Sequence, residues 1–378
     1  TTLVALDQPA AFDCIDYEIL INRLRQTFGV TGKVLNWLKS YLNGRSSFVH
    51  YSNASSNTSL VEADVTQGSA LWPYLLSVYI SPLSNVIRSF GINHHQYADD
   101  TQLYITVLKD DVLSCVCRLE SCINAVHKWL SQNWLSLNPK KSEAIQFTSG
   151  HGQSRVEDIA SIAVSGVRIK PSTVVKSLGV TLDGGLTFDQ HIANVCKASY
   201  FHIRALRHVR KSLPDDVAKT VACSIVGSRI DYCNALLVGM SDSNFAKLQR
   251  VQNTLARVVL GLRKFEHITP ALIELHWLPV KQRVTFKLAT LTMKTIHSGQ
   301  PTYLRDLVNA YEPVRTLRSS SQHLLCVGRT RTVTAARSFR HSSATIWNSL
   351  PAEIRDCTAV DNFKRKLKTH LFKLAFAA

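Results

Sequence analysis

The sequence predicts an α+β fold, and two observations favour it. Short apolar runs that end at turn residues recur in the first half of the chain and indicate buried strands. After about residue 186 these runs fade, and helical spacing of apolar residues dominates. The 378 residues are 45% hydrophobic, with 16 Gly and 11 Pro. This composition allows a large core and two or more domains, and it excludes collagen-like, low-complexity and disordered chains.

The first elements follow from short-range patterns. The apolar run over 3–6 ends at Asp7 and predicts a buried strand. Apolar residues recur at helical spacing over 16–28, and Gly29 closes this helix. The same pattern over 34–42 predicts a second helix.

The rest of the first half alternates in the same way. Residues 46–65 are polar and rich in Ser and Asn, which indicates a hairpin or loop. The apolar stretch 71–90 predicts a buried helix after Pro73. An acidic turn between two strand-like pieces is expected over 97–107, and a long amphipathic helix over 112–134. Three further strands are expected over 144–147, 162–167 and 174–182.

The second half is predicted to be mainly helical. An Arg/Ser/Thr-rich stretch over 312–345 indicates loops with short strands, and a basic helix is expected over 363–376. The other predicted helices cover 191–210, 217–237, 245–260 and 280–297.

The positive charge is concentrated in the second half of the chain. Residues 1–190 hold 15 basic and 16 acidic side chains, whereas residues 191–378 hold 29 basic and 11 acidic ones. Such asymmetry indicates a polyanionic partner, and nucleic acid is the first expectation for an intracellular chain.

The nine cysteines are odd in number and irregularly spaced, which predicts reduced thiols in an intracellular protein. Cys115, Cys117 and Cys122 have no His/Cys pair at zinc-finger spacing, so a metal site there is not favoured. No apolar run approaches the roughly 18–20 residues of a membrane span, so no membrane partner is expected.

Three carboxylates have informative neighbours. Asp7 ends a strand, and Asp99 and Asp100 lie at a turn between strands. An isolated carboxylate in a low-dielectric environment costs several kcal/mol unless it is paired or bound to a metal. Mg²⁺ takes oxygen ligands and commonly uses one or two carboxylates together with substrate phosphates. The alternative is that the Asp-Asp pair is a solvated turn.

Five short motifs, in a fixed order, resemble the polymerase motifs of reverse transcriptases. Their sequences are most similar to those of non-LTR (LINE-type, CR1/L2/jockey-like) retrotransposons. They are LDQPAAFD at 6–13 (motif A), QGS at 67–69 with Pro73 (motif B), YADD at 97–100 (motif C), LNPKKS at 137–142 (motif D) and LGV at 178–180 (motif E).

The resemblance continues beyond these motifs and covers essentially the whole chain. The further matching segments are SRIDYCNALL at 228–237, HITP at 267–270, LHWLPV at 275–280, LRSS at 317–320 and IWNSLP at 346–351. The resemblance implies three regions. A right-hand polymerase palm, an antiparallel sheet with packed helices, is expected over 1–185. A helical thumb-like region over 186–265 and a basic, mainly helical C-terminal region over 266–378 follow it.

The resemblance also implies the metal-binding residues. Asp7, Asp99 and Asp100 would be the catalytic carboxylates that bind two Mg²⁺ ions, with Mn²⁺ as a substitute. Two ions about 3.5–4 Å apart activate the attacking 3′-hydroxyl and stabilise the leaving pyrophosphate. Asp13 is expected to be structural.

Four further residues would bind the nucleotide substrate. Phe12 would be the steric gate that excludes a 2′-hydroxyl, and Gln67 and Gly68 would contact the incoming nucleotide and the template. A glycine fits this role because the missing Cβ lets the backbone approach a ligand. Lys141 would stabilise the leaving pyrophosphate. The residues themselves leave a core aromatic at Phe12 and a solvated lysine at Lys141 as alternatives.

The implied activity is RNA-directed DNA polymerisation from dNTPs, on an RNA template and a DNA primer or target. The basic half would contact the nucleic-acid backbone without reading its sequence. The expected location is intracellular, at nuclear chromatin with a cytoplasmic ribonucleoprotein stage. A non-catalytic nucleic-acid-binding remnant is the main alternative, and a group II intron-like maturase is a third, which predicts other C-terminal motifs.

Some positions depart from the family pattern. Thr66 and Trp72 replace Pro and Gly of motif B, and Pro9 removes a backbone donor beside Asp7. A large indole at position 72 is expected to crowd the nucleotide side or to disturb the following helix. The chain starts at Thr1 on an apolar stretch, without the fingers and endonuclease expected before motif A. The fragment is therefore expected to be inactive by itself, and a decayed copy of the element is the alternative that these substitutions raise.

Overall fold

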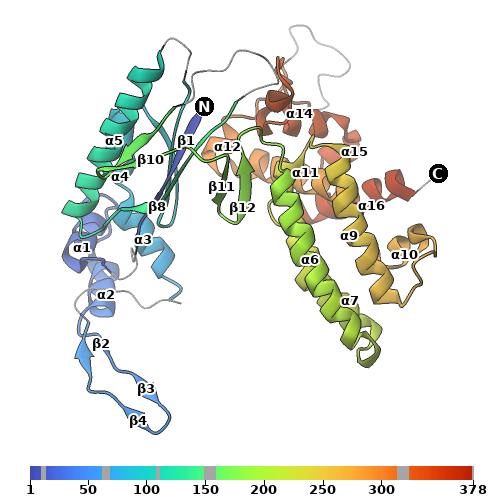
Figure 1. Cartoon of the computed structure of the whole chain (residues 1–378), viewed down its shortest axis with the longest axis horizontal. Coiled ribbons are helices and arrows are strands. Elements are labelled where there is room, and N and C mark those ends of the chain that lie inside the picture. The colour runs from blue at the N-terminus through green and yellow to red at the C-terminus, as the bar shows by residue number, and fades with distance from the viewer. Residues whose placement is uncertain (10–13, 62–68, 108–110, 149–158, 313–322, 377–378) are drawn as a thin grey trace. The chain divides into compact units, whose positions relative to one another are not determined.

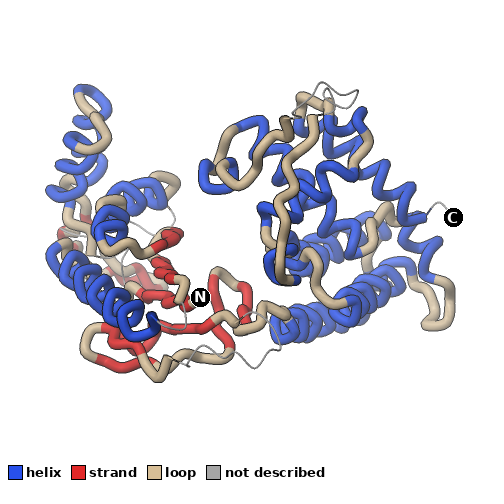
Figure 2. The backbone as a smooth tube through the Cα atoms, turned by 90° about the horizontal axis from the view of Figure 1, so that it is seen from above, coloured by secondary structure: helices blue, strands red, loops and turns tan. Residues whose placement is uncertain are grey.

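The structure is a computed structural model that describes residues 1–9, 14–61, 69–107, 111–148, 159–312 and 323–376. The chain divides into two compact units, Thr1–Ser177 and Leu178–Ala378 (Figure 1). The first unit mixes strands and helices, and the second is mainly helical (Figure 2). This agrees with the α+β prediction. The three-part division at 185 and 265 stays a prediction.

A four-stranded antiparallel sheet organises the first unit. Its strands lie in the order β6-β7-β1-β8. The bounds are Asn93–Tyr97 for β6, Asp100–Ile105 for β7, Thr2–Asp7 for β1 and Asn138–Gln146 for β8. The strand predicted over 144–147 thus begins six residues earlier than expected. The polar residues before Ala144 hid this extension.

One face of the sheet packs on the core and the other is more open. Along β1 burial alternates, with Thr2, Val4 and Leu6 nearly inaccessible and the intervening residues half-buried. This period-2 pattern is typical of a strand with one covered face. Asp7 therefore lies on the same face as Leu3 and Ala5, away from the core.

The helices of the first unit pack with this sheet around one apolar core. Asp16 caps α1, because its carboxylate accepts a hydrogen bond from the Ile19 N–H at 2.9 Å. The helix predicted over 71–90 is wrong: it is two helices, separated by Ser81 and Pro82, because proline lacks the N–H that a continuous helix needs. The bounds are α1 Tyr17–Gln26, α2 Gly32–Leu42, α3 Trp72–Ile80, α4 Leu83–Ser89 and α5 Val112–Gln132.

The indole at position 72 disturbs neither the helix nor the surface. Trp72 is the first residue of α3, and only 3% of its surface is exposed. It belongs to the apolar core, and the crowding of the nucleotide side expected from it stays a prediction.

Two predicted strands are instead hairpins. Residues 162–167 form part of β9 (Ile162–Val164) and β10 (Val167–Ile169), joined by a turn at Ser165 and Gly166 with φ of 46° and 81°. Residues 174–182 fall into β11 (Val174–Ser177) and β12 (Val180–Asp183), with Leu178 and Gly179 at φ of 45° and 79° between them. Positive φ at two successive residues is typical of tight hairpin turns.

Residues 46–60 form hairpin strands, as predicted. Two short pairs follow each other along this segment, and Figure 1 shows it extending away from α2. The strands are β2 Ser46–Ser47, β3 His50–Tyr51, β4 Ala54–Ser55 and β5 Ser59–Leu60.

The second unit contains the predicted helices, with two corrections. The helix expected over 217–237 is divided into several shorter segments. The stretch 312–345, expected to form loops with short strands, contains α13 and the first part of α14. The bounds are α6 Asp189–Val209, η2 Arg210–Ser212, α7 Asp215–Ala222, η3 Cys223–Gly227, α8 Ser228–Asp231, η4 Asn234–Leu237, α9 Asp242–Leu260, α10 Ile268–Glu274, α11 Val280–Ser298, α12 Thr302–Arg305, α13 Val333–Ala336, α14 Phe339–Ser349, α15 Ala352–Arg355 and α16 Val360–Phe376.

The helix α14 escaped prediction because small polar residues occupy its buried face. Ser342 and Ser343 are buried beside Ala344 and Trp347. The Ser342 hydroxyl donates a hydrogen bond to the Ser338 carbonyl at 2.8 Å, which satisfies it inside the helix.

Two apolar cores stabilise the second unit. The first includes residues from Val180 to Val284, and the second includes residues from Leu278 to Leu371. The helix α11 contributes to both, and it packs against α14 and α16. Across the described residues, no helix is long and apolar enough to cross a bilayer.

Candidate active site

Strand register brings Asp7 and Asp100 together. In the antiparallel pair of β1 and β7, Leu6 lies opposite Thr101 and Ala5 opposite Gln102. The next position in this register puts Asp7 opposite Asp100. Both residues therefore lie on the open face of the sheet, at the same end of their strands.

The third carboxylate lies in the turn that precedes β7. Tyr97 pairs with Asp100, so Ala98 and Asp99 form a two-residue hairpin turn. Ala98 has φ of 50°, a conformation that favours glycine and costs an L-residue about 1–2 kcal/mol. Backbone strain of this kind clusters at functional sites, because the surrounding structure must maintain it.

The three carboxylates influence one another electrostatically. Burial raises the pKa of Asp100, and the negative charges of Asp99 and Asp7 raise it further. One carboxylate oxygen of Asp7, Oδ2, is buried without a hydrogen-bond partner. The site thus concentrates negative charge that the protein itself does not neutralise.

This donor set fits a divalent cation. Carboxylate oxygens are the ligands that Mg²⁺ prefers, and a bound cation would both satisfy Oδ2 of Asp7 and offset the repulsion at Asp100. Within the described ranges, however, no three Asp, Glu, His or Cys side chains are already arranged as a metal site. The carboxylates are therefore neighbours, and an ion would have to draw them closer together.

The predicted residue Lys141 lies beside this site in an irregular part of β8. Ala5 pairs with Glu143 and Asp7 with Asn138, so four residues of β8 oppose the single residue Leu6. Lys141 is exposed in this bulge. Bulges are common next to active sites, where they redirect side chains.

Ser142 fixes the bulge, and the motif reading assigned it no role. Its hydroxyl accepts a hydrogen bond from the Asp7 N–H at 3.3 Å and donates one to the Asn138 carbonyl at 2.8 Å. Ser142 is buried, so these bonds are shielded from water. Its position inside the LNPKKS motif was the only sequence feature that could have indicated it.

Two glutamines complete the surroundings of the carboxylates. Gln8 donates to the Thr101 hydroxyl at 3.2 Å, linking the residue after Asp7 to the residue after Asp100. Gln102, on the open face, donates to the Ser177 hydroxyl at 2.5 Å. Ser177 immediately precedes the LGV turn, so this bond links β7 to the end of β11 within the first unit.

The remaining predicted site residues, Phe12, Gln67 and Gly68, lie outside the described residues, as does Asp13. Their roles stay predictions.

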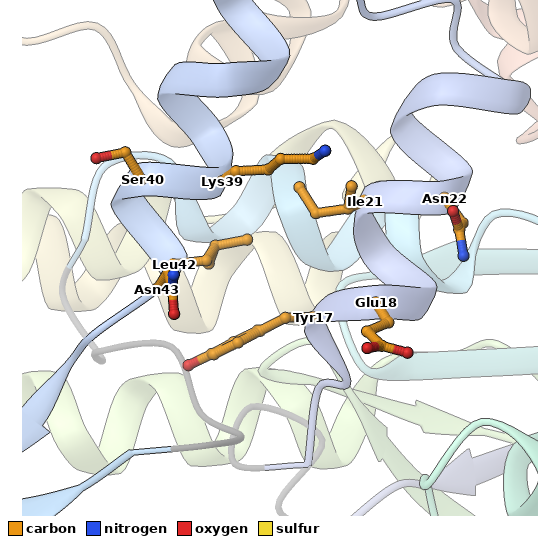
Figure 3. Close-up of a pocket in the computed structure, with 8 residues that line it drawn as sticks. All are labelled: Tyr17, Glu18, Ile21, Asn22, Lys39, Ser40, Leu42 and Asn43. Atoms are coloured by element: carbon orange, nitrogen blue, oxygen red, sulfur yellow. The ribbon is translucent and has the colours of Figure 1, made fainter.

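A separate cavity of about 470 Å³ lies between α1 and α2, and none of the predicted site residues lines it. Figure 3 shows Tyr17, Ile21 and Leu42 directed into the space between the two helices, whereas Glu18 and Asn22 point away from it. Its lining mixes polar side chains, among them Glu18 and Lys39, with the apolar Ile21 and Leu42.

Comparison with known proteins extends this description. The family described as reverse transcriptase (RNA-dependent DNA polymerase) matches residues 1–182. The probable RNA-directed DNA polymerase from transposon BS of Drosophila melanogaster is 27% identical over 268 residues, which are 68% of this chain and 28% of that protein. The probable RNA-directed DNA polymerase from transposon X-element of the same species is 25% identical over 280 residues, or 69% of this chain and 28% of that protein.

The RNA-directed DNA polymerase from the mobile element jockey of Drosophila melanogaster is 27% identical over 199 residues, which are 51% of this chain and 21% of that protein. The chain therefore spans less than a third of the length of these relatives. Among solved structures, telomerase from Candida albicans, in complex with a fragment of telomeric RNA, has a TM-score of 0.27 and 10% identity. The match covers 81% of this chain and 48% of that one.

Proposed function

We propose that this chain, whose residues 1–182 belong to the reverse transcriptase family of non-LTR retrotransposons, carries the nucleotidyl-transfer site of an RNA-directed DNA polymerase. The observation that supports this activity most is the strand register that brings Asp7 next to Asp100 on an open sheet face, with Asp99 in the adjoining turn. Asp7 precedes Asp99 by 92 residues in the sequence, so only the pairing of β1 with β7 brings the carboxylates together.

The reaction forms one phosphodiester bond. The 3′-oxygen of a DNA primer loses its proton and attacks the α-phosphorus of a dNTP that is paired with an RNA template. The bond from the α-phosphorus to the bridging oxygen breaks, and pyrophosphate leaves. The protein contributes positioning and electrostatic stabilisation.

Asp7, Asp99 and Asp100 would hold the two Mg²⁺ ions, or Mn²⁺ ions, of this reaction. When bound, such ions supply Lewis-acid stabilisation of the developing negative charge. The unpartnered Oδ2 of Asp7 and the raised pKa of Asp100 support this assignment, because both are relieved by a cation. Ser142 orients Asp7 through its backbone, and so acts as a positioning residue.

The substrate contacts are part of the same proposal. Phe12 would exclude the 2′-hydroxyl of a ribonucleotide, Gln67 and Gly68 would contact the nucleotide and template, and Lys141 would face the pyrophosphate. The exposed position of Lys141 beside the Asp7 strand supports its role. The intracellular location, at nuclear chromatin with a cytoplasmic ribonucleoprotein stage, belongs to this proposal as well.

Primer extension tests the activity. The full chain is incubated with an RNA template, an annealed DNA primer, dNTPs and Mg²⁺, and it is compared with Asp99→Asn. The matched control is Glu18→Gln, an exposed carboxylate on α1. Whatever extension the wild type supports, we expect Glu18→Gln to retain it and Asp99→Asn to reduce it at least about 100-fold. Undiminished synthesis by Asp99→Asn would refute the site.

A non-catalytic nucleic-acid-binding remnant is the second candidate. The absence of a ready three-carboxylate metal site among the described residues favours it, as does the basic second unit. It predicts no extension by the wild type, together with RNA binding that weakens steeply with salt.

A further inference from the structure

The second unit contains a cavity of about 630 Å³ that the polymerase site does not use. Residues from α7, α8, η4, α11 and α16 line it, together with the loop between α10 and α11. Its volume lies within the range of small-molecule sites, about 300–1,000 Å³. Two segments that carry the family resemblance but have no role at the carboxylates, 228–237 and 275–280, both contribute lining residues.

The loop before α11 forms the apolar wall of the cavity where the two cores of the second unit meet. Trp277 belongs to the first core and Leu278 to the second. His276, just before them, has φ of 54°, so the chain turns sharply at this point. Phe286, one and a half turns into α11, adds a second aromatic ring to the lining.

The lining includes a buried amide that is only partly hydrogen-bonded. Asn234 is only 3% exposed, and its amide nitrogen donates to Oδ1 of Asp231 at 3.2 Å. This bond fixes the orientation of the amide. Its oxygen, Oδ1, is buried and accepts no hydrogen bond. A buried acceptor left unpaired costs about 1–3 kcal/mol, but this oxygen is not accessible to solvent, so a ligand donor reaches it only if the lining shifts.

Asp231 is not available to neutralise added positive charge, because Arg283 already pairs with it. The guanidinium donates from Nε to Oδ1 at 2.8 Å and from a second nitrogen to Oδ2. This two-bond contact ties α8 to α11 and leaves both charges satisfied.

Three lysines add uncompensated positive charge to the lining. Lys219 comes from α7, Lys287 from α11 and Lys368 from α16. In the part of the chain that the structure describes, none of them forms an ion pair. Three helices that are distant in sequence therefore direct cations to one cavity, which favours a phosphate-bearing ligand.

We propose that this cavity binds one nucleotide of a single-stranded nucleic acid, with its phosphate at the three lysines and a sugar hydroxyl or base amine donating to Oδ1 of Asn234. A nucleotide has three features that are complementary to the lining: an anion, a flat apolar ring and a hydrogen-bond donor. Single-strand binding sites commonly pair cationic grooves with aromatic side chains in this way. The site is in the second unit, whereas the catalytic carboxylates are in the first, so it adds a binding function that does not depend on catalysis.

Charge reversal tests the site with a matched control. The full-length double variant Lys287→Glu/Lys368→Glu changes two exposed lysines of the lining. The control Lys294→Glu/Lys373→Glu makes the same charge change at exposed positions of the same two helices, outside the cavity. Fluorescence anisotropy of a labelled 12-nucleotide single-stranded RNA measures affinity. We expect a loss of at least about tenfold in the first pair and less than about threefold in the control. Equal losses would overturn the proposal.

A second set of measurements identifies the ligand. In isothermal titration, AMP should bind the wild type and bind Asn234→Leu at least fivefold more weakly, with folding checked by circular dichroism. If Asn234→Leu fails to fold, the lysine pairs decide. Displacement of the RNA by inorganic sulfate as readily as by AMP would reduce the site to an anion site and refute it. If the lysine substitutions weaken AMP binding but not RNA binding, the ligand is a free nucleotide and not a nucleic-acid strand.

Failure here is separable from failure of the polymerase assignment. The Asp99→Asn chain should bind the 12-nucleotide RNA as the wild type does.

Discussion

The two units of the chain differ in net charge and in the elements that arrange their charged residues. Residues 1–177 contain 15 basic and 14 acidic side chains, and residues 178–378 contain 29 and 13. In the first unit, a rigid strand register brings carboxylates together, and a cation would relieve them. In the second, helices bring lysines to a cavity that an anion would relieve. The proposed metal site and the proposed nucleic-acid site therefore depend on different elements, a strand register in the first unit and helices in the second.

The largest expected effect is the salt dependence of RNA binding, which should depend on the lysines of the second unit and not on the carboxylates of the first. Raising salt from 50 to 200 mM should weaken RNA binding by at least about 100-fold, because cations released from the nucleic acid oppose binding at high salt. The slope of log affinity against log salt should fall by about 1–2 in Lys287→Glu/Lys368→Glu and stay unchanged in Asp99→Asn. A slope that Asp99→Asn lowers equally would contradict the division of roles.

The next largest effect is expected for the hydrogen bonds that Ser142 makes beside Asp7, at the end of β1. Ser142→Ala removes a buried acceptor for the Asp7 N–H and a donor to the Asn138 carbonyl. We expect the free energy of unfolding of the first unit to fall by about 1–2 kcal/mol in urea titration. Ser131→Ala, which removes only an exposed bond within α5, is the control and should cost less than about 0.5 kcal/mol. Equal costs would argue against a special role for the bulge.

A pH effect of similar size belongs to the second unit. Burial lowers the pKa of His191, whose Nδ1 accepts a hydrogen bond from the Thr181 N–H at 3.3 Å. The unfolded chain therefore takes up this proton at a higher pH than the folded chain does. The contribution of His191 to the unfolding free energy is constant above about pH 6.5. Below that pH it should fall, by up to about 1 kcal/mol per pH unit.

His191→Gln should remove this acid sensitivity, measured as the slope of unfolding free energy between pH 5 and pH 7. His208→Gln, at an exposed position of the same helix, should leave the slope unchanged. An unchanged slope in His191→Gln would mean that other groups govern acid unfolding of the second unit.

The smallest expected effect tests the strain in the catalytic turn. Ala98→Gly should raise the unfolding free energy by about 0.5–1 kcal/mol, because glycine adopts a φ of 50° without strain. The same substitution at Ala5, inside β1, should lower it by about 0.5–1 kcal/mol. A destabilising Ala98→Gly would show that this turn is not strained.

How far the sequence predicts each unit depends on whether the deciding pattern is local. The apolar run before Asp7 and the acidic turn at Asp99 and Asp100 are local, and the strands and hairpin were predicted from them. The pairing of these segments came only from the family resemblance, because strand register joins residues far apart in the chain. The strand pattern over 174–182 missed the turn at Leu178, because an apolar residue with positive φ continues the pattern of a strand; only the motif E resemblance indicated this turn.

The second unit was less predictable. The polar face of α14 concealed a buried helix, and the cavity could not be foreseen because Lys219, Asn234, Lys287 and Lys368 lie on separate elements. Helix periodicity predicts which face is apolar but not which helices meet. The roles predicted for Phe12, Gln67 and Gly68 still await a test by substitution.

Metal binding to the first unit tests the central claim most directly. Mn²⁺ is titrated into the full chain, and bound Mn²⁺ is followed by electron paramagnetic resonance, with Mg²⁺ as competitor. We predict a site that Mg²⁺ displaces, that Asp7→Asn weakens at least tenfold, and that Lys287→Glu/Lys368→Glu leaves unchanged. Mn²⁺ binding by Asp7→Asn as tight as that of the wild type would contradict the assignment of the carboxylates.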